Sequence, residues 1–291
     1  MKIGMAGLGR MGGNMLQRIR NEGHEGVGWT RTRERSEVGT LANLVEALTP
    51  PRVAWLMLPA GQPTEDAVKE LTGLMEAGDI IVEGGNSNYK DSVRRGGQVS
   101  EKGIGYIDAG VSGGVWGIKN GYCLMVGGDK EHIQVVQPIF DALAPEGGFV
   151  HAGAQGAGHF TKMVHNGVEY GMMQAYGEGY ELLAASELGI DVEGALKAWR
   201  QGSVVQSWLL DLLVKALSED QGLAGIAGWA EDSGEGRWTV DEAIRLGVPL
   251  HVISASLFAR FSSRQPESPA MKVIAALRQQ FGGHAIKSDR A

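Results

Sequence analysis

The sequence predicts an α/β domain over residues 1–155 followed by an all-α domain over residues 156–291. In the first part, short apolar runs alternate with amphipathic segments, which is typical of a mostly parallel sheet covered by helices. After Gly156 the strand signals fade and long helical patterns replace them. The expected strands are 2–6, 25–29, 52–58, 79–83, 104–108 and 122–126, and the expected helices are 156–188, 192–200, 206–217, 238–246, 248–261 and 268–280.

The composition is that of a globular protein in a reducing compartment. The chain has 291 residues, 43% of them hydrophobic and 21% charged, and a net charge of −7. The negative charge argues against binding to nucleic acid or to a membrane surface. No run approaches the roughly 18 apolar residues of a membrane span, and the first residues do not form a signal peptide. Cys123 is the single cysteine, which excludes an internal disulfide. We therefore expect a cytoplasmic protein.

A glycine-rich turn follows the first predicted strand. It reads Gly7-Leu8-Gly9-Arg10-Met11-Gly12 and opens a helix. In dinucleotide-binding folds the first glycine allows the tight turn, the second lets the backbone approach a pyrophosphate, and the third lets helix and strand pack closely. The position of this turn after an N-terminal strand predicts a Rossmann-like dinucleotide-binding domain, although glycine turns without ligands are common.

The residues after the second predicted strand bear on the choice of cofactor. An NAD site normally carries an acid here for the ribose hydroxyls, whereas this chain has Thr30-Arg31-Thr32-Arg33. Hydroxyls and guanidinium groups suit a 2′-phosphate, which favours NADP over NAD. The alternative is a solvated basic turn, partly neutralised by Glu34 and Glu37. Residues 32–41 leave little room for a full helix and strand.

Three further loops should emerge at the carboxyl edge of the sheet, where open α/β sheets bind ligands. They carry Leu58, Asn86 and the turn Ser112-Gly113-Gly114. Asn86 could reach the nicotinamide or a substrate hydroxyl, and the Ser112 turn offers a hydroxyl and successive amides to a carboxylate. The alternative is that these are ordinary turns that need glycine.

A row of polar residues on the first helix of the second domain is the candidate active site. Helical spacing places Lys162, His165, Asn166, Glu169 and Tyr170 on one stripe of an otherwise apolar helix. A buried structural hydrogen-bond network is the alternative, but burying lysine and glutamate without a function is costly. His159 on the same helix is interpreted as structural. The spacings typical of metal sites are absent, so no metal is expected.

These motifs together resemble the 6-phosphogluconate dehydrogenase (decarboxylating) family, in a short form that lacks the duplicated helical region of longer members. The resemblance spans nearly the whole chain, and the 156–171 block and the Phe-Gly-Gly-His tail are its most specific parts. The matching segments are 7–12, 84–87, 111–114, 156–171, Arg237-Trp-Thr, Phe258-Ala-Arg260 and the 278–284 segment Arg-Gln-Gln-Phe-Gly-Gly-His.

The resemblance implies a role for each matching residue. Lys162 would be the general base at the C3 hydroxyl of 6-phosphogluconate, and Glu169 the acid that protonates C1 of the enediol after loss of CO2. His165 and Asn166 would orient substrate hydroxyls, and the Ser112, Gly113 and Gly114 turn would hold the carboxylate region. The phosphate end would be bound by Tyr170, Arg260 and Arg278, with His284 nearby. In the family the tail arginine and histidine come from a neighbouring subunit, which implies a homodimer or homotetramer.

Two segments depart from the family pattern. Ser233 and Glu235 stand where long members have a phosphate-binding lysine and threonine, so phosphate binding would depend on the arginines. Of the Asn-Arg-Thr that meets the 2′-phosphate in NADP-binding members, Thr30-Arg31-Thr32 keeps the last two residues.

Two other functions stay open on the sequence. A β-hydroxyacid dehydrogenase for a small unphosphorylated acid shares the glycine motifs, but it has less need of Arg260 and Arg278. A non-catalytic dinucleotide-binding sensor is the other, and the presence of Lys162 and Glu169 argues against it.

Overall fold

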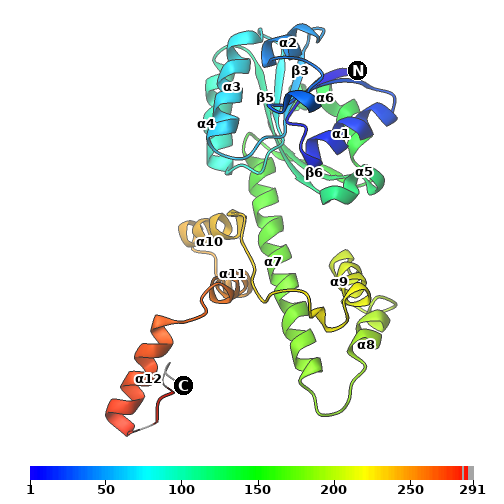
Figure 1. The fold of residues 1–291 in the computed structure, drawn as a ribbon. Helices are drawn as coiled ribbons and strands as arrows, with labels where there is room; N and C mark the ends of the chain where they lie inside the picture. Colours follow the sequence, from blue (N-terminus) through cyan, green and yellow to red (C-terminus); the bar gives the residue numbers. More distant parts are fainter. Residues whose placement is uncertain (284, 288–291) are drawn as a thin grey trace. The chain divides into compact units, whose positions relative to one another are not determined.

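The computed structural model describes residues 1–283 and 285–287. Its contacts divide the chain into two compact units, 1–166 and 167–291. Figure 1 shows a sheet covered by helices in the first unit and helices alone in the second, so the predicted fold class is confirmed. The long helix α7 (Ala157–Ala184) begins in the first unit and continues into the second.

In the described part of the chain, the first unit has a seven-stranded sheet in the order β2-β1-β3-β4-β5-β6-β7. Neighbouring strands are parallel except β5 and β6, which pair antiparallel with Asp108 opposite Gly127. The strands are β1 (Lys2–Ala6), β2 (Glu25–Trp29), β3 (Val53–Leu56), β4 (Ile80–Glu83), β5 (Gly105–Ser112), β6 (Cys123–Gly127) and β7 (Phe149–Gly153). The six predicted strands are therefore all present, whereas β7 was missed.

Strand β7 escaped prediction because it lacks a buried face. Three of its five residues are exposed and two are half-buried, so its sequence carries no apolar run. It is an edge strand, and its pairing with β6 is interrupted between Val126 and Gly127.

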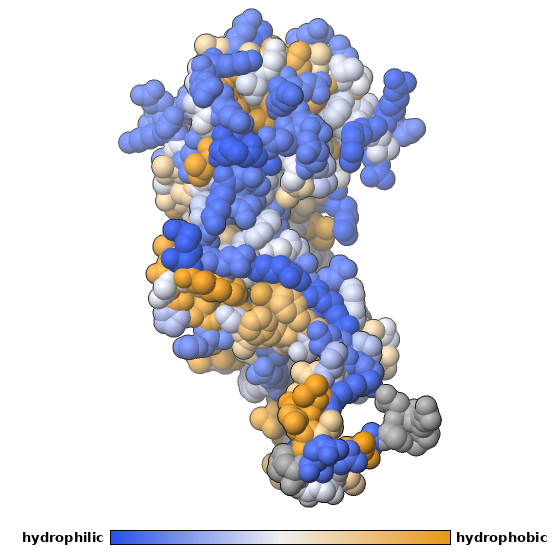
Figure 2. Space-filling model, turned by 90° about the vertical axis from the view of Figure 1, so that its left-hand side faces the viewer, coloured by the Kyte–Doolittle hydropathy of each residue, from blue (hydrophilic) through white to orange (hydrophobic). Residues whose placement is uncertain are grey.

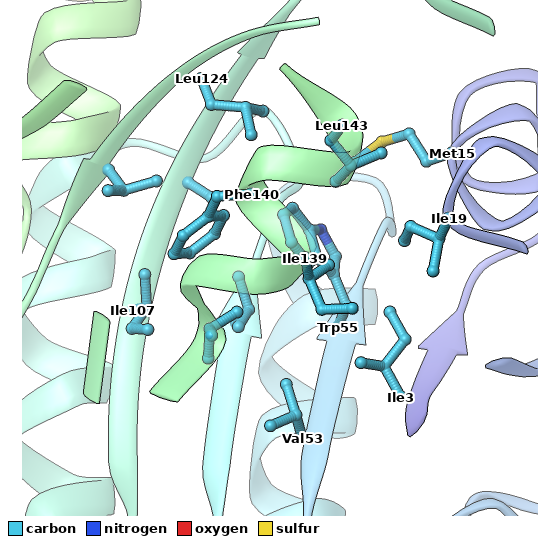
Figure 3. Close-up of a cluster of buried hydrophobic side chains, with 14 of the residues drawn as sticks. Ile3, Met15, Ile19, Val53, Trp55, Ile107, Leu124, Ile139, Phe140 and Leu143 are labelled. Carbon is cyan, nitrogen blue, oxygen red and sulfur yellow. The ribbon is translucent and has the colours of Figure 1, made fainter. Parts of the chain in front are cut away.

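Helices cover both faces of the sheet because nearly every residue of the central strands is apolar and buried. On one face α1 (Arg10–Asn21) and α6 (Lys130–Leu143) pack on Ile3, Val53 and Trp55 through residues such as Met15 and Phe140. Figure 3 shows these side chains pointing toward one another. The other face is covered by α2 (Leu41–Glu46), α3 (Gln62–Leu74) and α4 (Tyr89–Ser100).

The segment after β2 is short, and it lies along the outer edge of that strand. A 3₁₀ turn, η1 (Arg33–Arg35), leads into Glu37, whose N–H donates to the Gly28 carbonyl at 2.9 Å. The Glu37 carboxylate accepts the Gly28 N–H at 2.9 Å and pairs with Arg20 at 2.7 Å. The outward backbone groups of Gly28 are therefore satisfied without a further strand.

The second unit consists of the remainder of α7 and shorter helices. Leu196, Leu210 and Val214 form a small core with Tyr176 and Tyr180 of α7. Ser207 and Ser268 each cap a helix by accepting a backbone N–H. The helices are α8 (Val192–Trp199), α9 (Trp208–Glu219), α10 (Glu235–Leu246), α11 (His251–Ser263) and α12 (Pro269–Gly282), and the 3₁₀ turn η3 (Gln221–Leu223) follows α9. In the first unit, η2 (Gly114–Trp116) and α5 (Gly117–Asn120) lie between β5 and β6.

Within the described residues, no helix is both long and apolar enough to cross a membrane.

Candidate active site

The first glycine turn has the geometry that a pyrophosphate requires. Gly7 has a φ of +104°, and a Cβ there would lie 2.3 Å from the Met57 carbonyl oxygen. A Cβ on Gly12 would lie 1.9 Å from the Gly7 oxygen, so strand and helix meet at this point. Gly9 precedes α1, and a Cβ there would meet nothing within 4 Å. No acidic residue stands in the first turn of α1, so its amide groups can receive an anion.

The basic residues after β2 are exposed, and the nearest acid is occupied. Arg31 and Thr32 lie on the surface, and the Thr30 N–H donates to Ser36 Oγ at 3.0 Å. Burial raises the pKa of Glu37, but hydrogen bonds from Arg20 and from the Gly28 N–H outweigh it and hold that pKa below its ordinary value. The Glu37 carboxylate is therefore already engaged by Arg20 and the Gly28 N–H, and it is not available to bind a ribose.

The loops after β3 and β4 lie against each other. A Cβ on Gly85 would lie 2.5 Å from the Leu58 carbonyl oxygen, and one on Gly84 would lie 2.2 Å from the Trp55 ring nitrogen. The glycine pair allows this approach, and it leaves the next residue, Asn86, exposed beside the Leu58 loop. The structure thus places both predicted residues at the carboxyl edge of the sheet.

A hydrogen-bonded cluster joins the end of β5 to the first part of α7. Lys162 Nζ donates to Asn166 Oδ1 at 2.7 Å. The same oxygen lies 3.1 Å from His165 Nδ1, and His165 Nε2 lies 3.4 Å from Ser112 Oγ. Because an amide oxygen only accepts, the proton of His165 belongs on Nδ1, and Ser112 donates to Nε2.

The turn after Ser112 depends on glycine. Gly113 and Gly114 have φ values of +132° and +55°, which favour residues without a side chain. Lys162 is only 8% exposed, and a Cβ on Gly110 would lie 2.4 Å from the Lys162 Cβ. The lysine therefore rests directly on the backbone of β5.

The first turn of α7 is held by an acid that the sequence analysis missed. Asp108 of β5 is fully buried and accepts the N–H groups of Gly156 at 2.6 Å and His159 at 2.8 Å. A carboxylate at this position accepts hydrogen bonds from two otherwise unpaired amides. It also interacts favourably with the positive, N-terminal end of the helix dipole. An acid inside an apolar strand run was the signal that could have revealed it.

In the second unit, Tyr170 is the centre of a group formed by α7, the segment before α10, and α11. Its hydroxyl oxygen accepts the Ser233 N–H at 3.2 Å, and the guanidinium of Arg260 lies 3.6 Å from the centre of its ring. Ser233 Oγ donates to Glu235 at 2.6 Å, and Glu235 is 1% exposed at the start of α10. Glu235, which departs from the family pattern, is therefore buried and accepts a hydrogen bond from Ser233.

Two arginines beside this group were not singled out as binding residues. Asp232, with a side chain only 4% exposed, pairs with Arg237 at 2.7 Å and Arg264 at 3.0 Å. The hydrogen bond from Arg237, followed by that from Arg264, lowers the pKa of Asp232 to about 2 although burial opposes the shift. Both guanidinium groups also lie over the ring of Phe261.

The remaining predicted residues are not all brought together. Glu169 is half-buried on α7, seven residues after Lys162. Arg278 lies on α12, whose residues 269–280 are exposed, and none of the described contacts of Tyr170 or Arg260 involves it. His284 lies outside the described residues.

These features define a class of protein. A glycine turn after β1 opens a helix at the carboxyl edge of the sheet, and a lysine with hydrogen-bonding groups lies against β5 of the same sheet. This is the arrangement of a nicotinamide-dependent oxidoreductase, in which the sheet holds a dinucleotide and a side-chain base faces the substrate.

Comparisons with known proteins identify the family. Residues 2–153 match the NAD binding domain of 6-phosphogluconate dehydrogenase, and residues 158–288 match the 6-phosphogluconate dehydrogenase C-terminal domain. The chain belongs to the 6-phosphogluconate dehydrogenase family.

Relatives extend over the whole chain. The Bacillus subtilis protein YqeC, whose name places it in the same family, is 44% identical over 99% of both chains. An NAD⁺-dependent decarboxylating 6-phosphogluconate dehydrogenase of Haloferax volcanii is 39% identical over 98% of both. The decarboxylating enzyme of Lactococcus lactis is 35% identical, and the match covers 97% of this chain and 66% of that one.

Solved structures agree. The Plasmodium falciparum 6-phosphogluconate dehydrogenase has a TM-score of 0.84 at 29% identity, covering 100% of this chain and 67% of that one. A 3-hydroxyisobutyrate dehydrogenase of Mycobacterium tuberculosis has a TM-score of 0.74 at 21% identity over 95% and 99% of the two chains, which shows a shared fold alone.

Proposed function

We propose that this chain catalyses the oxidative decarboxylation of 6-phospho-D-gluconate to D-ribulose 5-phosphate and CO₂, with reduction of NADP or NAD. This is the oxidative reaction of the pentose phosphate pathway. The observation that carries the proposal is the cluster of Ser112, Lys162, His165 and Asn166 in a chain of this family. The cluster supplies a base and hydroxyl-orienting groups, which an oxidation of a polyhydroxy acid needs.

We assign Lys162 as the general base and Glu169 as the general acid. The bound nicotinamide supplies the acceptor for the hydride from C3. Lys162, as the neutral amine, takes the proton of the C3 hydroxyl, and as the ammonium it then donates this proton to the C3 carbonyl oxygen while the C1 carboxylate leaves as CO₂. Glu169 gives a proton to the former C2 of the resulting enediol, which becomes C1 of ribulose 5-phosphate, and the hydroxyl on the former C3 returns its proton to Lys162. The two residues are two turns apart on one helix, so they can serve different carbons of one substrate.

The groups around Lys162 orient the substrate in this proposal. Asn166 Oδ1 accepts from both Lys162 and His165, which fixes the amide so that its nitrogen is the donor toward a substrate hydroxyl. Asn86 contributes a further amide from the loop after β4. Ser112 and the amides of Gly113 and Gly114 hold the carboxylate end.

The phosphate end is assigned to the group around Tyr170. The Tyr170 oxygen accepts from the Ser233 N–H, so its own hydrogen can point to a phosphate oxygen. Arg260 adds a guanidinium stacked on the same ring. An unphosphorylated hydroxy acid would leave this pair without a partner, which counts against the β-hydroxyacid dehydrogenase alternative.

Arg278 and His284 are proposed to act from a neighbouring subunit. Residues of α12 such as Met271, Val273 and Leu277 are each 58% exposed, and apolar helices of this kind pack against a partner. Figure 2 shows apolar residues gathered on the surface of the second unit. We infer a homodimer or homotetramer in which the C-terminal segment of one copy completes the site of another.

NADP is the cofactor that the residues after β2 favour. Arg31 and the hydroxyls of Thr30 and Thr32 suit a 2′-phosphate, and Glu37 is held by Arg20. NAD is the alternative, and the NAD⁺-dependent relative from Haloferax volcanii favours it. Residues 7–12 and Leu58 would hold the rest of the dinucleotide.

We propose the functional division 1–155 for dinucleotide binding and 156–291 for substrate binding and oligomerisation. The dinucleotide-binding part would then end just before the helix that carries Lys162. A cytoplasmic location fits a substrate made and used in central metabolism, and the single Cys123 fits a reducing compartment.

Initial rates with 6-phosphogluconate, measured separately with NADP and NAD and with CO₂ release followed in parallel, test the proposal. Equal amounts of CO₂ and reduced cofactor are expected. Gluconate is the matched control because it lacks only the phosphate, and it should react at least tenfold less efficiently. Turnover of gluconate as good as that of 6-phosphogluconate, or reduced cofactor without CO₂, would contradict the assignment.

A further inference from the structure

Behind the proposed active site, the sheet unit buries a chain of polar side chains that the reaction does not use. Glu83 ends β4, Ser92 and Arg95 lie on α4, Tyr106 lies on β5 and His159 lies in the first turn of α7; each is at most 2% exposed. Arg95 donates to Glu83 at 2.8 Å, and Tyr106 donates to the other oxygen of the same carboxylate. Ser92 Oγ lies 3.3 Å from Glu83 and 2.7 Å from His159 Nδ1.

The charges at the Glu83 end of this chain are fixed. Burial, followed by the neighbouring Glu83 carboxylate, raises the pKa of Tyr106 well above its ordinary value, so the phenol keeps its proton and donates. For Arg95 burial acts in the opposite direction, but the charge of Glu83 together with the hydrogen bond and charge of Glu65 outweighs it and the pKa is raised. Glu83 thus accepts hydrogen bonds from a cation and from a phenol.

Ser92 has one hydroxyl hydrogen and three neighbours that could accept it: His159 Nδ1, the Glu83 carboxylate and, at 3.5 Å, the Asn88 carbonyl oxygen. If Ser92 donated to His159 Nδ1, the ring proton would sit on Nε2, which is buried and has no hydrogen-bond partner in the described structure. A buried N–H without an acceptor is among the rarest defects of folded proteins. If Ser92 donates to Glu83, then His159 Nδ1–H donates to Ser92. The last hydrogen bond of the chain is then accepted by the Glu83 carboxylate. The chain therefore runs from His159 through Ser92 to Glu83.

His159 connects this chain to the helix that carries the lysine. Its backbone N–H is held by Asp108 at 2.8 Å, so both its main chain and its ring are fixed to the sheet unit. Gly158 lies so close to the strands that a Cβ would be 2.3 Å from the Asp108 carbonyl oxygen. Lys162 follows one turn later and rests on Gly110. A shift or rotation of this first turn would move the lysine directly.

We propose that His159 is a positioning residue for Lys162, acting through the hydrogen-bonded chain His159–Ser92–Glu83. The inference rests on the proposed role of Lys162 as the base. It gives a specific content to the structural role that the sequence indicates for His159. A displacement of about 1 Å at a reacting group can cost roughly 10²-fold in rate, so a side chain that never touches the substrate can control turnover.

Two isosteric substitutions separate positioning from packing. Asn places an N–H where histidine has Nδ1, and Leu has the shape of Asn but no hydrogen-bonding group. We expect His159→Leu to lower kcat at least tenfold, with the KM for 6-phosphogluconate and the Kd for NADP within twofold of the wild-type values. His159→Asn should keep kcat within about threefold. Equal kcat values for the two variants would overturn the proposal.

Ser92→Ala tests the same chain from its middle and serves if His159→Leu does not fold. Its kcat should fall as in His159→Leu. The double variant should have a kcat only slightly lower than that of either single variant, because both substitutions break the same hydrogen-bonded chain. Independent, multiplicative losses for Ser92→Ala and His159→Leu, or for Ser92→Ala and His159→Gln if the leucine variant is not obtained, would contradict a shared pathway.

Two measurements do not depend on turnover. ¹⁵N NMR of ring-labelled histidine, assigned with His159→Asn, should show the proton of His159 on Nδ1; a proton on Nε2 would overturn the chain. Acetylation of Lys162 by acetic anhydride, read by peptide mass spectrometry, should become at least threefold faster in Ser92→Ala while exposed Lys102 is unchanged. An unchanged Lys162 rate would contradict positioning. If wild-type protein does not oxidise 6-phosphogluconate, the proposed function fails, and these two results still decide the role of His159.

Discussion

The sheet unit and the helical unit both hold polar side chains that the proposed reaction depends on, but they hold them differently. In the sheet unit Glu83, Arg95 and Asp108 are at most 1% exposed, and each binds a partner on another element. In the helical unit Asp232 is buried, but its partner Arg237 has a side chain that is 52% exposed. The lysine therefore stands on a frame that one copy of the chain completes by itself.

The group around Tyr170 is completed less fully by its own chain. It has Arg260 and Ser233, whereas the other predicted phosphate residues, Arg278 and His284, lie on or after the exposed helix α12. The difference teaches that the reacting end and the phosphate end can fail separately. Changes near Lys162 should act on kcat, and changes near Tyr170 should act on KM.

The strongest test of the sheet unit is Lys162→Met, which keeps the length of the side chain and removes the base. Turnover should fall by about 10³-fold or more, the upper part of the range for loss of a general base. The Kd for NADP, measured by fluorescence titration, should change less than twofold. Lys102→Met is the control, because Lys102 is an exposed lysine of the same unit. Substantial residual turnover would remove Lys162 from the base role.

Glu169→Gln tests the proposed general acid, which lies on the part of α7 that belongs to the helical unit. Ribulose 5-phosphate formation should fall about 10²-fold, because the amide cannot protonate C1 of the enediol. The products are quantified by chromatography after a fixed time. Glu178→Gln on the same helix is the control, since Glu178 is exposed and accepts a hydrogen bond from Gln174. Unimpaired product formation would show that another group is the acid.

Arg260→Met separates the two ends most directly. Loss of a charge-assisted hydrogen bond of about 1.5–3 kcal/mol corresponds to a KM for 6-phosphogluconate raised roughly ten- to a hundredfold. The kcat at saturating substrate should stay within about threefold. Steady-state kinetics give both numbers, and Arg200→Met, which removes an exposed ion pair with Asp211, is the control. A fall in kcat with unchanged KM would contradict the division of roles.

A smaller effect, confined to the sheet unit, is expected for Arg31→Ala. The ratio of kcat/KM for NADP to that for NAD should fall about tenfold, since one guanidinium near the 2′-phosphate is lost. Lys69→Ala, an exposed cation on α3, should leave the ratio unchanged. If Arg31→Ala leaves the ratio unchanged as well, the basic turn is a solvated surface.

Asp232→Asn should affect stability and have the smallest effect on kcat. The pKa of Asp232 in the folded protein is about 2, below its ordinary value of 3.8, mainly through its hydrogen bond with Arg237. Because the pKa is lower in the folded state, the ionised carboxylate stabilises the folded protein fully above pH 4. This contribution to the free energy of unfolding is lost as the pH falls toward 2. The free energy of unfolding of the variant should be about 1–3 kcal/mol lower than that of the wild type at pH 7.

Urea unfolding at several pH values measures this loss. The difference between wild type and Asp232→Asn should shrink as the pH falls from 4 to 2. Asp211→Asn, at a surface pair, should cost less than about 1 kcal/mol. A difference that stays constant with pH would contradict the ion-pair explanation.

The order of strands and helices could be predicted because the apolar runs are long and buried on both sides. Strands 2–6 and 25–29 were placed to the residue, since both are bounded by turn residues. Strand β7 could not be predicted, because an edge strand with exposed residues has no apolar period. The antiparallel pairing of β6 is likewise a long-range property that local sequence does not carry.

For the site, the sequence identified side chains by type and spacing but not their supports. The stripe from Lys162 to Tyr170 follows from helical periodicity alone. The capping of α7 by Asp108 depends on contacts across 48 and 51 positions of sequence, which no local pattern contains. The hydrogen bond that Ser233 donates to Glu235 is likewise visible only in the fold.

The closed edge at β2 has a consequence for the behaviour of this protein in a crowded solution. An open outer strand is a template on which another chain can add a strand, and that is a route to aggregation. Here Glu37 occupies both outward groups of Gly28 with its own backbone and side chain, and its bond to Arg20 places two charges beside that edge. The same few residues that form the short segment after β2 therefore also prevent another chain from adding a strand to the sheet.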